Sequence, residues 1–444
     1  MLPLSSFRRA VGVFLTVGTM LVVSTASPAS AAPTSDQTAN SLCSLPVLSQ
    51  LCPPRTAVLD GDRLARNRIG LLFGDRALRT SLNDLLVQAN AALTKGPWSV
   101  MDKTQVPPSG DRHDYLSLAP YYWPTKPQTP DNPQGCPYVN KDGVRNPATD
   151  AIPDKASRLT AFTAIYQLTL AWYYTGDAKY AKRAALDLRT WFLDPATKMN
   201  PNMNFAQGIP CQTDGRGIGI IEFSYTFTQV LDAAAILNTG APGWTRNDDA
   251  TMKAWSKEFL TWLQTSKNGK DEAGQQNNHG TFLDMLMGGI AIYTGQQQVA
   301  KDIVEKAKTN RLDKQIAADG SQPMEATRTR SYHYFTFNLV ALTRLAQVAK
   351  HVGIDLWSYQ TPQGGSLVKA VDFILPAATG GQSFWPYQEL NFLQYAAKDS
   401  VHAAADAGDK AAKAALPKVP APPGGDLYPV RPAAEQLDDI SITG

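Results

Sequence analysis

The chain is 444 residues long, with 43% hydrophobic and 18% charged residues, and this composition excludes a disordered protein. Its 31 prolines follow no three-residue period, which excludes a collagen-like fold. The formal net charge is only +3, so the composition does not predict nucleic acid as a partner. The length would allow two or three domains, but no long linker divides the chain, so one large domain is equally compatible with it.

The N-terminus has the pattern of a secretory signal peptide. Arg8 and Arg9 precede an apolar run over residues 10–23, and Ala29-Ser30-Ala31 forms a small-residue cleavage motif. A membrane anchor needs about 20 apolar residues, and this run is shorter and interrupted. We therefore predict a signal peptide over residues 1–31 and a secreted mature protein. No later stretch is apolar enough to predict a membrane span, so we expect no membrane partner after cleavage.

Four cysteines lie beyond the predicted cleavage site: Cys43, Cys52, Cys136 and Cys211. An even number of cysteines in an oxidising compartment predicts disulfides. Cys43 and Cys52 are close enough in sequence for a local bridge, which leaves Cys136 to pair with Cys211. Both cysteines of the second pair lie in loops rich in Pro and Gly, and their bond would join these loops.

Residues 32–56 are rich in Ser, Pro and Thr, and we expect an N-terminal arm there. Helical periodicity begins after Asp75, where leucines recur at spacings of three and four. Residues 94–154 are instead dense in Pro, Gly, Asp and aromatic residues, and a loop of this length is usually functional. Further helices are predicted over 155–175, 177–193, 217–238, 249–266, 276–294, 296–308, 331–352, 366–374 and 388–414. The prolines that follow predict an extended tail over residues 417–444, so the helical domain is expected over residues 57–416.

Several of the predicted helices are paired through short glycine turns, for example at Gly176 and Gly295. Alternating runs of β-branched residues are almost absent, so a sheet-based fold is not expected. Helical hairpins that each bury one stripe can stack as an open solenoid or close into an α/α barrel. Because the sequence has no fixed repeat, we predict an all-α fold, an α/α barrel or incomplete toroid of helical hairpins.

Motifs for phosphate transfer, zinc proteases and lipases are absent. Gly215-x-Gly217-x-Gly219 follows a Cys/Pro loop rather than a strand, and we interpret it as a helix entry. The five histidines are too scattered to predict a metal site, and we expect no metal and no cofactor. They are His113, His279, His333, His351 and His402.

Three clusters of polar and aromatic residues are candidates for a functional site. The first lies in the long loop region and contains His113, Tyr115 and the run Tyr121-Tyr122-Trp123. Aromatic faces and hydroxyls suit sugar rings, although packing of the loop onto the helices would explain these residues equally well. The second is residues 275–280, a run of amides that ends in the pair Asn278-His279. Either this pair directs donors into a cleft or an Asn simply caps the helix.

The third cluster covers residues 325–338 and precedes an apolar helix. Its candidates are Glu325, Arg328, Arg330, Tyr332, His333 and Tyr334. On a helix, Arg330 and Tyr334 face together because they are four residues apart. Arg328 can meet Tyr334 only if the helix begins after Arg328, with a Ser or Thr as its cap.

Asn, His, Arg and Tyr, without a metal or an obvious carboxylate pair, fit the β-elimination of a polymer of uronic acids. The C5 proton can be removed only when donors neutralise the C6 carboxylate and stabilise the enolate-like state. A base takes this proton while an acid protonates the departing O4. Nearby arginines are expected to favour the phenolate of a tyrosine, whose unperturbed pKa is about 10.

These residues resemble the alginate-lyase-domain family of secreted polysaccharide lyases, whose members degrade alginate or polyglucuronates such as glucuronan on an α/α barrel. The resemblance is carried by Tyr115–Pro124, Gly215–Ile221, Asn277–Gly280 and Arg328–Tyr334. These segments span most of the expected barrel, and together they are fairly specific.

The resemblance implies that Asn278 and His279 neutralise the substrate carboxylate and that an Arg and a Tyr of the third cluster are catalytic. The best-known alginate lyases read Arg-x-x-x-Tyr-His-Asn-Tyr, with the catalytic Tyr last. When Arg330 is matched to that Arg, the last position is Phe337 in this chain. The chemistry must then move to an earlier tyrosine, and we predict Tyr334. The departure makes glucuronan-type substrates an option beside alginate.

Tyr334 could serve as both base and acid when the C5 proton and O4 lie on one face of the sugar, whereas His279 could be the base when they lie opposite. Arg328 and Arg330 complete the predicted catalytic set, and Glu325 is expected to hydrogen-bond the C6 acid or to position Arg328. The expected substrate contacts are Tyr121, Tyr122, Trp123, His113, Tyr115, Glu325, Tyr332, His333 and Arg216.

A second hypothesis is a glycoside hydrolase on the same barrel, with paired carboxylates such as Glu222 and either Asp284 or Glu325. A third is a non-catalytic carbohydrate-binding protein, which would explain the aromatic residues but not the concentration of Arg, Tyr and His. The leading prediction remains a lyase that acts as a monomer on an acidic polysaccharide.

Overall fold

The computed structural model describes residues 53–437 of the chain. The predicted signal peptide, most of the expected arm and residues 438–444 lie outside the described residues. The predicted bridge between Cys43 and Cys52 also lies outside them.

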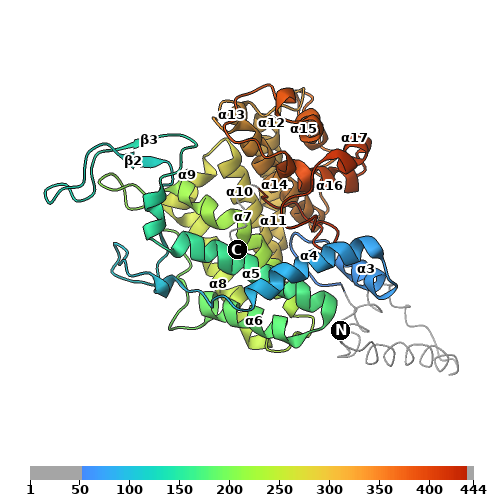
Figure 1. Cartoon of the computed structure of the whole chain (residues 1–444), viewed down its shortest axis with the longest axis horizontal. Coiled ribbons are helices and arrows are strands. Elements are labelled where there is room, and N and C mark those ends of the chain that lie inside the picture. Colours follow the sequence, from blue (N-terminus) through green and yellow to red (C-terminus); the bar gives the residue numbers. More distant parts are fainter. Residues whose placement is uncertain (1–52, 438–444) are drawn as a thin grey trace. The chain divides into compact units, whose positions relative to one another are not determined.

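Four long helices follow one another through the centre of the helical domain. They are α5 (Asp154–Thr175), α7 (Ile221–Leu237), α10 (Asn278–Tyr293) and α14 (Ser331–Lys350). Helix α5 packs on α7, α7 on α10 and α10 on α14 (Figure 1). Each of these helices has buried residues on all of its faces, which is typical of the inner helices of a barrel.

A second set of helices covers this inner row. It consists of α6 (Ala178–Leu188), α8 (Arg246–Thr265) and α11 (Gln297–Ala307). Helix α6 packs on α5, and both α8 and α11 pack on α10. Residues 189–193 and 308–312 extend α6 and α11 as short π-helical turns. The predicted all-α fold, an α/α barrel of helical hairpins, is confirmed.

Local signals in the sequence set the ends of these helices. Gly176 ends α5 in the left-handed conformation at φ 73°, and Asp177 then caps α6 through its side chain. Asn277 caps α10 by accepting a hydrogen bond from the backbone N–H of His279. The second polar cluster of the sequence therefore lies at the N-terminus of an inner helix.

The prediction that no stretch after the signal peptide is apolar enough to span a membrane is wrong. Residues Gly217–Leu237 form a helical stretch of 21 residues that is long and apolar enough to cross a bilayer. However, 89% of its most apolar window is buried inside the structure. Because α5 and α10 pack against it, the apolar composition reflects a core position.

Three of the four short strands in the described residues lie in the long loop region, and the fourth lies near residue 206. Strand β1 (Leu116–Leu118) pairs in parallel with β4 (Phe205–Gly208), and β2 (Tyr122–Pro124) pairs antiparallel with β3 (Tyr138–Asn140). The predicted disulfide between Cys136 and Cys211 is present and joins the two loops.

The remaining helices lie before and after the barrel pairs. They are α3 (Gly61–Leu72), α4 (Arg76–Ala92), α9 (Lys267–Ala273), α12 (Asp313–Gln315), α13 (Pro323–Ala326), α15 (Leu367–Gly380), α16 (Lys398–Asp406) and α17 (Lys410–Ala415). The single helix expected over 388–414 is wrong, because its first part is irregular and Gly408 at φ 99° separates α16 from α17. Helix α15 continues beyond its expected end and contains Pro376.

Residues 419–437, here called the tail, contain no helix but pack against six helices. Tail carbonyls accept hydrogen bonds from Asn67 of α3, Ser81 of α4, Tyr174 of α5 and Arg344 of α14. Glu435 bonds Gln229 of α7, and Arg431 lies 2.7 Å from Asp399 of α16. The tail therefore joins the first helices of the domain to the last.

Candidate active site

Tyr334 lies in the first turn of α14, where residues from distant segments meet. Its hydroxyl is 3.1 Å from the hydroxyl of Tyr121, beside strand β2. The guanidinium carbon of Arg328 lies 3.6 Å from the centre of the Tyr334 ring. This contact is possible because α14 begins at Ser331, after Arg328, although no side chain caps the helix there.

Arg328 is held on the ring by Asp142, a residue of the loop after β3. The Nη2 of Arg328 donates to this carboxylate at 2.7 Å, and its Nε does so at 3.3 Å. The hydroxyl of Thr329 also donates to Asp142. Gly143 is required beside it, because it lies at φ 74° and a Cβ there would come within 2.5 Å of Thr329.

The environment of Tyr334 keeps its phenol protonated. Burial raises the pKa of Tyr334 well above its ordinary value, and the neighbouring Tyr121 raises it further, whereas the charge of Arg328 lowers it. Arg328 therefore favours the phenolate, as expected, but the loss of solvent around the phenol outweighs this charge. A protonated phenol can donate a proton.

Asn278 is fully buried, so the expectation that it presents donors to a cleft is wrong for this conformation. Its backbone N–H and its side-chain amide both donate to the carboxylate of Glu325, at 2.7 and 2.9 Å. Burial raises the pKa of Glu325, whereas the hydrogen bonds from Asn278 and the charges of Arg328 and His279 lower it. Glu325 thus links α10 to the segment that carries Arg328.

His279 is the next residue along α10 and has a different exposure. Its Nδ1 lies 2.9 Å from a carboxylate oxygen of Glu272 in α9. The side chain of Glu272 is fully buried, whereas that of His279 is 17% exposed. A carboxylate on one ring nitrogen fixes the orientation of the imidazole, which leaves Nε2 available for a proton.

Arg216 lies near the same carboxylate and close to the aromatic run. Its guanidinium carbon is 5.0 Å from the centre of the Tyr122 ring. Burial lowers the pKa of Arg216, whereas Tyr122, Glu222 and Glu272 raise it. Two of its nitrogens donate to Gln207, a residue of β4.

These groups form what we call the Tyr334 cluster. It consists of Tyr121, Tyr122, Asp142, Gln207, Arg216, Glu272, Asn278, His279, Glu325, Arg328 and Tyr334. Contacts or charge interactions connect each member to another, across segments that are far apart in the sequence.

Three other predicted residues of the third cluster have different partners. Arg330 lies near Glu389, with 3.9 Å between Nε and the carboxylate. Tyr332 is buried against Trp385 and donates to the carbonyl of Gln394. His333 is buried, stacks on Phe337 and contacts the edge of the Tyr334 ring.

Of the first sequence cluster, only Tyr121 and Tyr122 reach the Tyr334 cluster. Tyr115 is fully buried and donates to Glu222, which excludes the expected substrate contact in this conformation. The ring of His113 bonds the carbonyl of Lys198. Trp123 donates to the carbonyl of Val144 in the hairpin region, on the other side of the strand from its neighbours.

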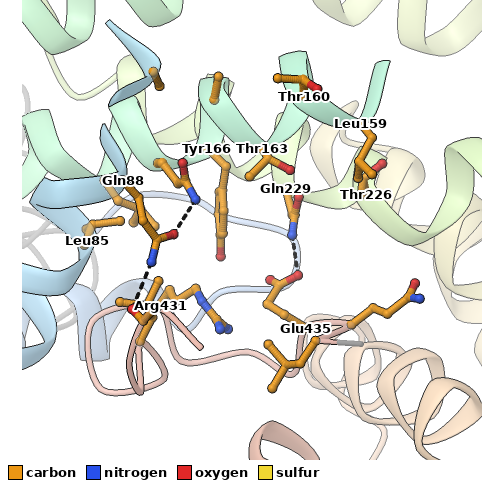
Figure 2. A pocket seen from close by; sticks show the side chains of 18 of the residues that line it. Leu85, Gln88, Leu159, Thr160, Thr163, Tyr166, Thr226, Gln229, Arg431 and Glu435 are labelled. Carbon is orange, nitrogen blue, oxygen red and sulfur yellow. Dashed lines mark hydrogen bonds between the residues drawn. The ribbon is translucent and has the colours of Figure 1, made fainter. Parts of the chain in front are cut away.

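A cavity of about 410 Å³ lies between α4, α5, α7 and the tail. Figure 2 shows Gln229 and Glu435 bonded to each other within its lining, and Gln88 bonded on two sides. No member of the Tyr334 cluster lines this cavity. The candidate site is therefore assigned by its chemistry and not by its volume.

A model of the family described as alginate lyase matches residues 99–385 of the chain. The chain belongs to the alginate lyase family. An alginate lyase from Bacteroides ovatus is similar in structure over 86% of this chain and 100% of its own, with 34% sequence identity and a TM-score of 0.80. Alginate lyase A1-III from Sphingomonas species A1 is similar over 86% of this chain and 98% of its own, with 18% identity and a TM-score of 0.53, which supports the fold alone. No curated protein sequence matches the chain.

Membership of the alginate lyase family makes the protein a polysaccharide lyase, which excludes the hydrolase as its primary activity. The carboxylates proposed for hydrolysis also have other partners. Glu222 accepts hydrogen bonds from Tyr115 and Ser117, and Asp284 is paired with Arg311 at 2.8 Å.

The sequence analysis did not predict three members of the Tyr334 cluster: Asp142, Gln207 and Glu272. Glu272 precedes His279 by seven residues, and a turn between two helices could have indicated that they meet. Asp142 and Gln207 lie in irregular segments, where no periodicity predicts which residue faces the site.

Proposed function

We propose that this lyase cleaves a polyuronate, alginate or glucuronan, by β-elimination at the Tyr334 cluster. The observation that carries the proposal is the position of Tyr334, whose hydroxyl is beside Tyr121 and whose ring is covered by the guanidinium of Arg328. A tetrasaccharide complex of alginate lyase A1-III, in a histidine-to-alanine variant, agrees with an oligosaccharide ligand for this fold.

In this mechanism Arg328 supplies the positive charge that neutralises the C6 carboxylate. Its side chain is 21% exposed, so a substrate can reach it beside Asp142. When the C5 proton leaves, negative charge spreads onto the oxygens of the C6 carboxylate. A fixed cation stabilises that state. Asn278 and Glu325 act on the substrate indirectly, by fixing the start of α10 relative to Arg328.

His279 is the proposed base, and Tyr334 is the proposed acid. Nε2 of His279 takes the proton from C5, the electron pair of that bond forms the C4=C5 double bond, and the C4–O4 bond breaks. The hydroxyl of Tyr334 gives its proton to the departing O4. The raised pKa of Tyr334 supports the acid role, because the phenol remains protonated until O4 needs the proton.

This division of roles suits a sugar whose C5 proton and O4 lie on opposite faces. When they lie on one face, Tyr334 would have to act as base first, and its raised pKa opposes that step. Among polymannuronate, polyguluronate and glucuronan, only polyguluronate has the opposite arrangement, because guluronate is the C5 epimer of mannuronate. These roles therefore predict the fastest cleavage on the guluronate units of alginate and slower cleavage of polymannuronate and glucuronan. His279→Ala should abolish cleavage of polyguluronate and slow cleavage of the others less.

We also propose that the lyase is secreted. The N-terminal signal pattern over residues 1–31 and the disulfide between Cys136 and Cys211 support this location, because disulfides persist in oxidising compartments.

The test is ultraviolet absorbance of the new C4=C5 double bond, which is conjugated to the carboxylate. The purified enzyme is assayed in parallel on polymannuronate, polyguluronate and glucuronan, with Tyr334→Phe as the inactive variant. Tyr332→Phe is the matched control, since its hydroxyl bonds Gln394 outside the cluster. No absorbance on any polymer, or equal loss in both variants, would contradict the proposal.

A further inference from the structure

Gln207 has an unusual backbone conformation for its residue type. It lies at φ 49°, in the left-handed region that glycine favours, and it is one of two described non-glycine residues with positive φ. Leu116 of β1 pairs with Phe205 of β4, but Leu118 pairs with Gly208, so β4 contains one extra residue. Such bulges redirect a side chain and are frequent beside active sites.

Several hydrogen bonds hold Gln207 in this conformation. Its backbone N–H donates to the hydroxyl of Ser117 at 2.8 Å, and Ser117 in turn donates to the buried carboxylate of Glu222 at 2.6 Å. Its backbone carbonyl accepts from Nε of Arg216 at 3.0 Å. Its side-chain oxygen accepts from Nη2 of the same arginine at 2.9 Å.

The other end of the side chain has a different environment. Among residues 53–437, no group accepts a hydrogen bond from the amide nitrogen of Gln207, although the residue is only 7% exposed. A polar atom that is both buried and without a partner would be a defect of the fold, and the amide nitrogen of Gln207 is not such an atom. Since it has no partner among the described residues, it must be exposed to solvent. Because Arg216 fixes the oxygen, both N–H groups are held in one direction.

Arg216 connects Gln207 to the rest of the Tyr334 cluster. Arg216 stacks on Tyr122, the neighbour of the Tyr121 that meets Tyr334. Arg216 is also close enough to Glu272, the partner of His279, for their charges to interact. A fixed pair of donors beside a guanidinium suits a carboxylate.

We propose that Gln207 binds the substrate, with its amide nitrogen donating to a carboxylate oxygen of a uronate unit, and that Arg216 positions it. This inference rests on the proposed polyuronate substrate. A purely structural role would need the backbone and the oxygen of Gln207, which bond Ser117 and Arg216, but not the nitrogen. The left-handed backbone of Gln207 then has a function, because it holds the two N–H groups of the side-chain amide in the direction of the substrate.

The test measures binding separately from catalysis, in the inactive Tyr334→Phe background. Calorimetric titrations use an alginate tetrasaccharide and a glucuronan tetrasaccharide. Gln207→Glu replaces the donors by a carboxylate of the same shape, and we expect at least tenfold weaker binding. Gln212→Glu is the matched control, because Gln212 is exposed on the same segment and the change in net charge is identical, and we expect less than a twofold change.

Gln207→Gly guards against a failure to fold, since glycine adopts positive φ without strain. We expect an unchanged melting temperature with at least tenfold weaker binding. Unchanged affinity in this variant, or an equal loss in Gln212→Glu, would overturn the inference. Tetrasaccharide binding that depends on Gln207 without any unsaturated product from the wild type would instead overturn elimination alone. If neither tetrasaccharide binds the background, the inference about Gln207 is wrong, whereas formation of unsaturated product by the wild type decides the proposed function separately.

Discussion

Two regions of the lyase contain charged side chains away from bulk solvent, and they differ in what those charges face. Where the tail crosses α14 and α16, Arg344 bonds Glu435 and Arg431 bonds Asp399, and all four residues are at most 5% exposed. We call this region the seam. In the Tyr334 cluster, by contrast, the side chains of His279 and Arg328 are 17% and 21% exposed.

The difference separates charges that are paired within the fold from charges that we propose to act on the substrate. In the seam each charge is compensated by its neighbour within the fold. In the cluster, His279 and Arg328 are each held on one side by a carboxylate, Glu272 and Asp142 respectively, and both side chains remain partly exposed. A fixed orientation with an accessible donor is what stabilisation of a developing charge requires.

The largest expected effect is the loss of Tyr334. Tyr334→Phe should lower kcat by about 10²–10⁴-fold, the range for removal of a general acid, while the melting temperature changes little. Initial rates of double-bond formation and thermal unfolding of the same preparation measure the two effects. A variant that loses stability as much as activity would place Tyr334 with the seam residues instead.

Breaking the seam should have the opposite signature. Arg431→Met leaves the carboxylate of Asp399 buried without its partner, and we expect a loss of about 3–5 kcal/mol in the free energy of unfolding. The kcat of the folded fraction should be unchanged. Lys267→Met is the control, because the ion pair of Lys267 with Asp271 is exposed and should contribute at most about 1 kcal/mol. Urea denaturation of both variants decides between these outcomes.

The seam is the part of the fold that the sequence predicts least well. The prolines of the tail correctly indicate a segment without helix. However, the composition of an extended tail does not differ from that of a tail that packs across six helices. The partners of Arg431 and Glu435 are more than 30 residues away in sequence, so no local spacing predicts the pairs. The inner helices were easier, because their long apolar stretches and glycine turns act locally.

The cluster shows the same limit at the level of single residues. Arg328 and Tyr334 lie in one dense motif, and the condition for their contact, a helix that begins after Arg328, could be stated from the sequence. Asp142 could not be predicted, because its place depends on a loop that the Cys136–Cys211 bond joins to a second loop. Gln207 has no signal of its own, since positive φ cannot be recognised in a residue other than glycine or asparagine.

A third prediction concerns pH and a buried carboxylate near the seam. Burial raises the pKa of Asp232 to about 7, although the backbone N–H groups of Leu59, Ala57 and Val58 lower it. An unfolded Asp has a pKa of about 4, so between these values the folded state holds a proton that the unfolded state releases. The stabilising contribution is therefore complete below pH about 4 and is lost as the pH rises to about 7, by about 1.4 kcal/mol for each pKa unit.

Asp232→Asn should flatten this dependence without changing the activity profile, because Asp232 does not contact the Tyr334 cluster. Chemical denaturation at several pH values measures it. Other buried carboxylates, among them Asp154 and Asp187 with pKa values raised to about 6, leave a smaller residual slope in the variant. An unchanged slope would show that Asp232 is ionised in the folded protein.

The smallest expected effect is also the most specific to the cluster. Asp142 holds Arg328 on the ring of Tyr334, and its negative charge raises the pKa of that phenol. Asp142→Asn keeps the shape but removes the charge, so the pKa of Tyr334 should fall. Because the protonated phenol is the proposed acid, the alkaline limb of the pH–rate profile should move to lower pH, with kcat/KM reduced by about tenfold, or about 1.4 kcal/mol.

Asp150→Asn is the matched control for this change, since Asp150 lies in the same region but pairs with the exposed Arg145. It removes the same charge without touching Arg328. An alkaline limb that moves equally in both variants would reflect net charge alone. A limb that stays in place in Asp142→Asn, with the rate still reduced, would mean that Asp142 acts only by holding Arg328 and that a group other than Tyr334 titrates in that limb.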